Sequence, residues 1–318
     1  MKTRLFFRTF LSSSGFLILL TFFVIFCTKN EKKAAFIPVK VASGLEFPEG
    51  PAWDGMGTLY VSDCYGPWIG RYHEGKLDTF VSKKNAQGNF ANSNGLTVYQ
   101  NGNLYACDFG LGAILEINPQ GQIQIVLEGY GGQPFNRPND LAFDPRGNLY
   151  FTDPKSYGAD KKDGIIYACF RDKNELRPVY EGLAFPNGIA FSPDTAYLYV
   201  CESALNRIVK FPLRADGGLE PYQVFAELPG GDPDGIAFDT AGNLYVAHFG
   251  SGFVYVLDNS GAIIQTIHMP GKKPTNVEFG GEDWRTLFIT EVETKALYTV
   301  QVEIPGLRLF SSPSGQND

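Results

Sequence analysis

One short pattern returns six times along the chain, and it constrains the fold more than any other feature. Each copy is a turn-forming tetrapeptide that leads into a short apolar strand, as Arg137-Pro138-Asn139-Asp140 leads into Leu141-Ala142-Phe143. One residue of each copy, which we call the marker, carries a side-chain oxygen: Glu49, Asn94, Asn139, Asn187, Asp234 or Asn276. Successive markers are 45, 45, 48, 47 and 42 residues apart. A regular period of this length indicates a repeat architecture rather than a sandwich of irregular hairpins.

Each marker is followed by a tight turn and a second strand. In the third unit, for example, Asn148-Leu149-Tyr150-Phe151 follows the turn Asp144-Pro145-Arg146-Gly147. Most units then show a further strand, such as 253–257. Short antiparallel strands joined by tight turns are typical of a propeller blade. We therefore predict an all-β fold: a six-bladed β-propeller of four-stranded antiparallel blades over residues 36–305, followed by a C-terminal tail over 306–318.

The first 33 residues differ in composition from the rest. They open with three basic residues and no acid, continue with an apolar run over 15–26, and reach Cys27 followed by a polar stretch. This order is typical of a segment that directs export through a membrane. We predict a signal peptide, a lipoprotein signal with lipid on Cys27, or an uncleaved anchor. The expected location is the bacterial cell envelope or periplasm, with membrane attachment only through the N-terminus, or otherwise secretion.

The rest of the chain is acidic. The whole chain has a formal net charge of −7, and the part after residue 27 carries 24 basic against 34 acidic residues. Such a surface repels the phosphates of nucleic acids and anionic membranes. We therefore predict no nucleic-acid partner, whereas cation binding suits this charge.

The body of the chain contains four cysteines, Cys64, Cys107, Cys169 and Cys201. An even number permits disulfides in an exported protein. Three of the four fall inside expected strands, however, and their spacings do not match a metal knuckle. We favour the interpretation that they are buried free thiols.

The markers also carry chemical information. The first strand of each propeller blade lines the central channel, so side chains at the start of those strands meet at one mouth. Carboxylate and amide oxygens suit a hard cation such as Ca²⁺ or Mg²⁺. A purely structural alternative exists, because Asn and Asp are favoured in turns and the following Gly allows the bend. We predict one divalent cation at this mouth.

These motifs resemble those of the regucalcin and gluconolactonase (senescence marker protein-like) family of six-bladed propeller hydrolases, over about residues 40–300. The residues that carry the resemblance are Glu49, Arg137-Pro138-Asn139-Asp140, Pro186-Asn187-Gly188 and Asp234-Gly235. The resemblance implies that Glu49, Asn187 and Asp234 bind the metal. It implies Asn139 as a further ligand or as a holder of substrate and water, Asp234 as general base, and Arg137 in contact with substrate. The resemblance gives no firm role to Asn94 and Asn276, which we expect to line the channel or to support the ligands from behind.

The resemblance further implies a metal-dependent lactonase that opens a sugar or small aliphatic lactone. The cation, Ca²⁺ or alternatively Mg²⁺, Mn²⁺ or Zn²⁺, would polarise the carbonyl while Asp234 activates water. The partner is then a small lactone or ester. Two alternatives stay open: phosphotriesterase or aryl-esterase activity at the same site, and a non-catalytic envelope-binding propeller with a structural calcium.

A second set of polar residues ends the second strand of each unit: Asp63, Asp108, Asp153, Glu202, His248 and Glu291. They form either a pocket rim, with His248 binding substrate or handling protons, or a set of loop anchors that accept hydrogen bonds from backbone amides. On adjoining loops, four aromatic residues either wall the pocket or pack in the core: Tyr65, Trp68, Tyr157 and Phe249.

Overall fold

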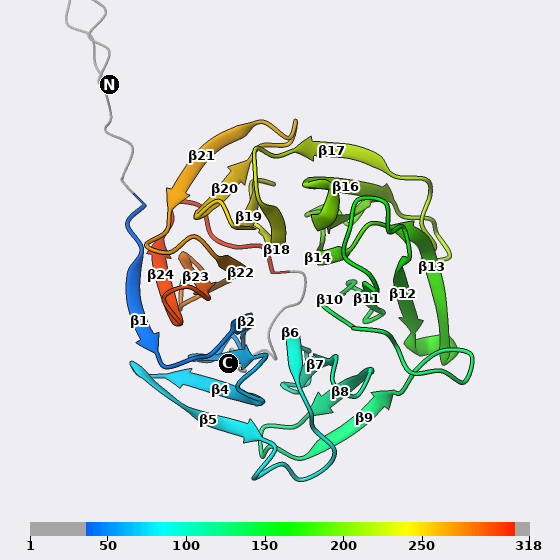
Figure 1. Cartoon of the computed structure of the whole chain (residues 1–318), viewed down its shortest axis with the longest axis horizontal. Coiled ribbons are helices and arrows are strands. Elements are labelled where there is room, and N and C mark those ends of the chain that lie inside the picture. Colours follow the sequence, from blue (N-terminus) through cyan, green and yellow to red (C-terminus); the bar gives the residue numbers. More distant parts are fainter. Residues whose placement is uncertain (1–35, 309–318) are drawn as a thin grey trace, which may run out of the picture. The chain divides into compact units, whose positions relative to one another are not determined.

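The structure is a computed structural model that describes residues 36–308. In this part of the chain, six four-stranded antiparallel sheets surround a central channel (Figure 1). The predicted all-β, six-bladed propeller is therefore confirmed. Helical structure in the described residues is limited to two single turns of 3₁₀ helix, η1 (Arg171–Lys173) and η2 (Ser203–Leu205).

The blades are numbered along the chain, and each is given from its innermost to its outermost strand. Blade 1 contains β2 (Pro48–Trp53), β3 (Thr58–Asp63), β4 (Trp68–His73) and β5 (Lys76–Ser82). Blade 2 contains β6 (Ser93–Val98), β7 (Leu104–Asp108), β8 (Ala113–Ile117) and β9 (Ile123–Leu127). Blade 3 contains β10 (Leu141–Phe143), β11 (Leu149–Asp153), β12 (Gly164–Phe170) and β13 (Glu175–Leu183). Blade 4 contains β14 (Pro186–Phe191), β15 (Tyr197–Glu202), β16 (Arg207–Pro212) and β17 (Gln223–Glu227). Blade 5 contains β18 (Asp232–Phe238), β19 (Leu244–Phe249), β20 (Phe253–Leu257) and β21 (Ile263–His268).

The sixth blade is built from both ends of the propeller. Its inner strands are β22 (Pro274–Gly280), β23 (Thr286–Glu291) and β24 (Ala296–Gln301), and its outermost strand is β1 (Val39–Ser43). β1 pairs antiparallel with β24, from Val39 opposite Thr299 to Ser43 opposite Ala296. The repeat pattern did not reveal this pairing, which joins the two ends of the ring in a seam.

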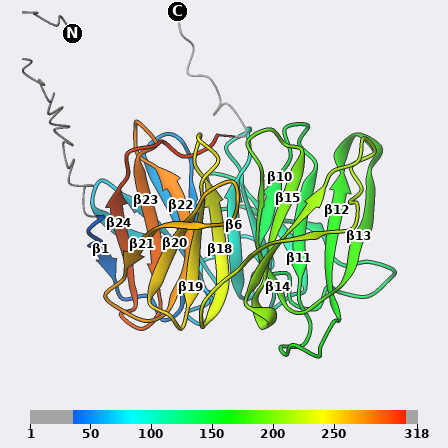
Figure 2. The same ribbon diagram turned by 90° about the horizontal axis from the view of Figure 1, so that it is seen from above.

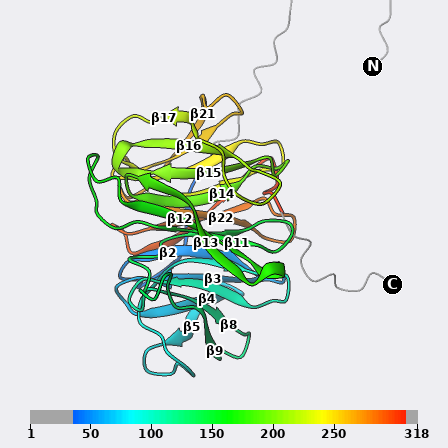
Figure 3. The same cartoon turned by 90° about the vertical axis from the view of Figure 1, so that its right-hand side faces the viewer.

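The inner strands run along the channel and place the markers at one end of it. β6 and β18 follow the channel axis in Figure 2, and the four strands of blade 4 lie side by side as one sheet in Figure 3. Five markers are the second or third residue of their innermost strand and Asn139 lies two residues before its strand, whereas residues such as Phe143 and Phe238 end theirs. The two ends of the channel are therefore chemically different.

Apolar side chains fill the space between neighbouring blades. Tyr105 of blade 2, for example, meets Phe143 of blade 3 edge-on with ring centroids 5.0 Å apart, and both rings are buried. Such large buried aromatic pairs contribute strongly to packing. Clusters of this kind hold the sheets face to face and keep the inner strands in fixed positions.

The cysteines of the propeller take part in this packing. Cys64, Cys107 and Cys201 are buried and Cys169 is partly buried, and all four are free thiols. Burial raises the pKa of each thiol, so none is poised to react as a thiolate.

The predicted targeting segment over residues 1–33 lies outside the described residues, as does the tail from residue 309. Its role in export, and the choice between a lipid on Cys27 and an uncleaved anchor, therefore stay predictions. Within residues 36–308, no helix has the length and apolar character needed to cross a membrane.

Candidate functional site

A pocket opens at the end of the channel where the innermost strands begin, and we call it the mouth pocket. Five of the six markers line it, one from each of blades 1 to 5: Glu49, Asn94, Asn139, Asn187 and Asp234. Arg137 lines it as well. The four residues expected to bind a metal therefore share one pocket, although they lie up to 185 residues apart in sequence.

The turn after each marker brings neighbouring blades unusually close. A Cβ on Gly188 would collide with the backbone oxygen of Asp234, and one on Gly235 would collide with the side chain of Asn276. Glycine is therefore required after Asn187 and Asp234 because any larger residue would push the next blade away. This close approach explains the Asn-Gly and Asp-Gly pairs of the repeat.

Hydroxyl groups of one blade hold the marker segment of the next. Thr152 of blade 3 donates a hydrogen bond of 2.8 Å to the backbone oxygen of Asn187 in blade 4. Ser203, which follows β15, donates one of 2.6 Å to the backbone oxygen of Pro233 in blade 5. These bonds are buried, so they position the marker side chains on a rigid support.

The two marker carboxylates lie in a poorly solvated setting. Glu49 is 4% exposed and Asp234 is 7% exposed. Burial, and then the charge of Asp140, raise the pKa of Glu49 to about 8. Burial, followed by the charges of Glu49 and Asp140, raises the pKa of Asp234 well above its ordinary value, and the amide of Asn187 opposes this rise. The charged neighbours in this set are all acidic.

This donor set fits a hard divalent cation. Two buried carboxylates that repel each other's ionisation would be stabilised as anions by a positive charge between them. The amide oxygens of Asn139 and Asn187 add neutral ligands of the kind that Ca²⁺ accepts. Within residues 36–308 no three His, Cys, Asp or Glu side chains group as a metal site. The candidate set thus depends on its two amides as much as on its two acids.

The raised pKa values predict how the stability of the metal-free protein depends on pH. Both carboxyl groups release their protons more readily in the unfolded chain, where the pKa of Glu49 returns to about 4.5. Stability is therefore highest below that pH and falls as the pH rises through about 8, by up to about 1.4 kcal/mol per pH unit for each group. We expect chemical denaturation in EDTA to show this fall between pH 5 and 8.

Saturating Ca²⁺ should flatten that dependence, because the ion binds the ionised carboxylates. Glu49→Gln should also make the fall in EDTA shallower, since one of the two groups no longer titrates. A free energy of unfolding that climbs steadily from pH 5 to 8 in EDTA would contradict this description of the site.

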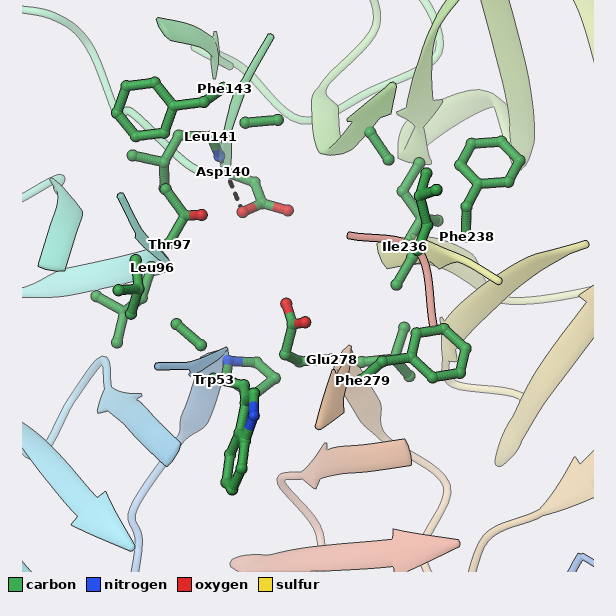
Figure 4. A pocket seen from close by; sticks show the side chains of 18 of the residues that line it. Trp53, Leu96, Thr97, Asp140, Leu141, Phe143, Ile236, Phe238, Glu278 and Phe279 are labelled. Atoms are coloured by element: carbon green, nitrogen blue, oxygen red, sulfur yellow. Dashed lines mark hydrogen bonds between the residues drawn. The ribbon is translucent and has the colours of Figure 1, made fainter. Parts of the chain in front are cut away.

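A second chamber occupies the opposite end of the channel. The carboxyl groups of Asp140 and Glu278 point into it, with Trp53 and Phe279 along its wall (Figure 4). Burial and the neighbouring Asp140 raise the pKa of Glu278 to about 8. Asn276, the one marker that does not line the mouth pocket, contacts this chamber and hydrogen-bonds to the carboxyl groups of Glu49 and Asp140. Glu278 lies outside the repeat pattern, and the sequence analysis did not single it out.

The second set of polar residues anchors loops. All six are buried and none lines the mouth pocket. Asp63 accepts the backbone N–H groups of Glu46 and Phe47 at 2.8 and 2.7 Å, and Asp153 accepts that of Arg137 at 2.7 Å. Asp108, Glu202 and Glu291 bind backbone amides in the same way. These acids therefore fix the segments that lead into the markers, which is the second of the two interpretations considered above.

His248 differs from the five acids but is no closer to the pocket. It is fully buried, and its Nε2 lies 2.8 Å from Oδ1 of Asn206 in blade 4. Burial lowers its pKa to about 4, so the ring is neutral at pH 7. Its neighbour Phe249 lines the pocket instead. The expected contact of His248 with substrate therefore does not fit its position, because the imidazole contacts Asn206 between blades 4 and 5.

Three of the four aromatic residues expected near the site line the pocket: Tyr65, Tyr157 and Phe249. Trp68 does not, because its indole Nε1 donates a hydrogen bond of 2.8 Å to Asp63. The sequence analysis missed six further lining residues: Phe47, Cys64, Phe109, Phe185, Ser203 and Asp232. The repeat contained a signal for four of them. Phe47, Phe185 and Asp232 each stand two residues before a marker, and Phe109 follows a loop anchor as Phe249 does.

Comparison with known proteins gives a consistent result. The family model described as the SMP-30/Gluconolactonase/LRE-like region matches residues 47–293, which is more than half of the chain. A gluconolactonase of Zymomonas mobilis is 32% identical over 283 residues, covering 80% of this chain and 78% of that protein. The solved structure of a gluconolactonase from Xanthomonas campestris superposes with a TM-score of 0.74 at 30% identity, over 84% of this chain and 89% of that one. Regucalcin from Agrobacterium tumefaciens, described as a calcium-binding protein, shares the fold with a TM-score of 0.73 at 22% identity, over 86% and 98% of the two chains.

Proposed function

This chain belongs to the SMP-30/gluconolactonase/LRE-like family, and from that premise we propose that it hydrolyses a lactone at one divalent cation in the mouth pocket. The observation that carries the proposal is the meeting of two buried carboxylates and two amides from four blades in one pocket. The gluconolactonases to which the chain is similar support the choice of a lactone as substrate.

Glu49, Asn139, Asn187 and Asp234 would hold the cation. Ca²⁺ suits the oxygen-only ligands best, and Mg²⁺, Mn²⁺ and Zn²⁺ are the alternatives. When bound, such an ion polarises a carbonyl and stabilises the negative charge that develops on its oxygen.

Asp234 is the residue we assign as general base. Its carboxylate lies on the innermost strand of blade 5 and faces the pocket, where it can accept a proton from a water molecule that attacks the carbonyl carbon. The Asn187 amide interacts with this carboxylate and favours its ionised form. Poor solvation strengthens this carboxylate as a base, and a bound cation would offset part of that gain.

Arg137 is the residue we assign to the substrate. It lies at the exposed rim of the pocket, and its backbone N–H is held by Asp153. A guanidinium suits the carboxylate that forms when a lactone opens, because it can donate two parallel hydrogen bonds to it. Asn139, two residues further along, lies deeper and offers an amide to the ion or to the substrate carbonyl.

The test is a panel of substrates offered to the full-length protein. We expect lactones to be opened with Ca²⁺ present, and the rate to fall at least about 100-fold in EDTA and to return when the ion is restored. A phosphotriester and phenyl acetate are included to measure the alternative activities. Full lactonase activity in EDTA, or no opening of any lactone at saturating Ca²⁺, Mg²⁺, Mn²⁺ or Zn²⁺, would reject the proposal.

A further inference from the structure

Six aromatic residues line the mouth pocket, and we call them the collar: Phe47, Tyr65, Phe109, Tyr157, Phe185 and Phe249. We infer that the collar selects lactones whose ring carries an apolar substituent, such as an alkyl chain, over polyhydroxylated sugar lactones. This inference rests on the proposed lactonase function and narrows its substrate class.

Five of the six collar rings pack in two groups, one on each side of the pocket. Phe47 contacts Tyr65 edge-on with centroids 4.9 Å apart and stacks near Phe249 at 6.5 Å. On the other side, Tyr157 meets Phe185 edge-on at 5.2 Å. These contacts join loops that lead into or follow the inner strands of blades 1, 3, 4 and 5. An apolar group entering the pocket would therefore meet aromatic surface on opposite sides.

The collar stays partly open to solvent. Tyr65 is 65% exposed and Tyr157 is 59% exposed, while the four phenylalanines are partly buried. Exposed aromatic groups gathered around one pocket commonly mark a binding surface, because solvent contact is unfavourable for them. Packing within the propeller does not account for rings in this position.

Phe185 provides an independent observation. Its backbone has a φ of +59°, in the left-handed region that bulky residues rarely adopt. Among the other described residues in this region, Asn174 and Asn206 end 3₁₀ turns, where asparagine adopts it readily, and Trp284 is the one other aromatic residue. A phenylalanine there is strained, and strain of this kind concentrates at functional sites. The ring of Phe185 also lies under the Arg137 guanidinium, 5.9 Å from its centroid.

Few polar side chains remain in the pocket to bind sugar hydroxyls. The hydroxyl of Tyr157 donates to Asp232 at 2.9 Å, and that of Ser203 donates to a backbone oxygen. With four markers assigned to the ion, three lining residues of the described pocket have polar groups that are not yet used: Arg137, Asn94 and the hydroxyl of Tyr65. A polyhydroxylated lactone would bury hydroxyl groups without partners here, which is unfavourable.

The experiment compares three lactones with the same six-membered ring: δ-decalactone, δ-valerolactone and D-glucono-δ-lactone. With full-length protein in saturating Ca²⁺, and after subtraction of uncatalysed opening, we expect kcat/KM for δ-decalactone to exceed that for the glucono-lactone at least tenfold. One apolar group in a hydrophobic pocket is sufficient for discrimination of about this size. A preference for the glucono-lactone would overturn the inference while the lactonase function stands.

Two variants test the collar itself. Phe185→Gly suits the left-handed backbone, and Tyr65→Ser changes an exposed ring, so both should fold. Each should lower kcat/KM for δ-decalactone at least about fivefold, mainly through KM, and change the value for δ-valerolactone less than twofold. Ile264→Ala, which removes an exposed apolar side chain on the outer strand β21, is the matched control and should change neither value. Equal losses on all three lactones would overturn the inference.

A binding measurement separates this inference from the function on which it rests. If no lactone is opened, the proposed function fails, and calorimetry with 5-hydroxydecanoate and gluconate in Ca²⁺ still tests the collar. Tighter binding of 5-hydroxydecanoate that weakens in Phe185→Gly supports an apolar selector. Equal affinity for the two acids overturns it.

Discussion

Replacing Asp234 by Asn should lower kcat for lactone opening about 1,000-fold. The amide cannot accept a proton from water, and general-base catalysis commonly contributes about 100- to 10,000-fold. An amide oxygen remains where the carboxylate stood, so the variant should still bind Ca²⁺, though less tightly. Steady-state kinetics at saturating Ca²⁺ measure the effect on turnover, and equilibrium dialysis shows that the ion is bound.

Asp232→Asn is the matched control, because it removes the same charge two residues earlier on β18. We expect its kcat to stay within about fivefold of the unmodified protein. The Asp234 variant should also be more stable than the unmodified protein in EDTA at pH 8, since one of two buried like charges is gone. Turnover retained in Asp234→Asn would remove this residue from the role of base.

Replacing Glu49 by Gln should weaken Ca²⁺ binding about 100-fold or more. Removing one partner of a buried charge interaction costs roughly 3–5 kcal/mol, and each 1.4 kcal/mol corresponds to a tenfold change in affinity. Glu49 and Asp234 supply the two negative charges that match a divalent ion, so the variant site has half the charge. Calorimetric titration of the metal-free protein measures the loss.

Glu278→Gln is the control for Glu49→Gln, because it removes a buried acid of the channel that is not proposed as a ligand. Glu278 shares with Glu49 a pKa raised to about 8, but it lies in the chamber at the opposite end. Both variants should gain stability in EDTA at pH 8. Only Glu49→Gln should lose affinity, with Glu278→Gln staying within about threefold. Unchanged affinity in Glu49→Gln would show that Glu49 is not a ligand.

The propeller was predictable because its repeat is visible without any structure. A marker followed by a short apolar strand recurs in every blade, and strands such as β10 (Leu141–Phe143) and β20 (Phe253–Leu257) fall where the pattern places them. The seam was not predictable from that pattern. β1 (Val39–Ser43) precedes the first marker and resembles no strand of the repeat, and its partner Ala296–Gln301 lies more than 250 residues away.

The meeting of the markers followed from topology, because the first residues of equivalent inner strands lie at the same end of the channel. The environment of each side chain could not be predicted from the repeat pattern. His248 occupies the same position in the repeat as Asp63 and Glu291. Its burial disfavours a charged imidazole, however, and the ring contacts Asn206. Likewise, the left-handed backbone of Phe185 depends on the loops around it and leaves no local sequence signal.

A cation at the proposed site would also link the two ends of the ring. Glu49 lies on β2, the strand after β1, whereas Asn139, Asn187 and Asp234 belong to blades 3, 4 and 5, which lie further along the chain toward β24. A cation held by all four residues would hold the early and late blades of the ring together. An ion that binds only the closed ring shifts the equilibrium between the closed and the open ring toward the closed one. The cation concentration around the protein would then set the fraction of molecules in which the ring is closed.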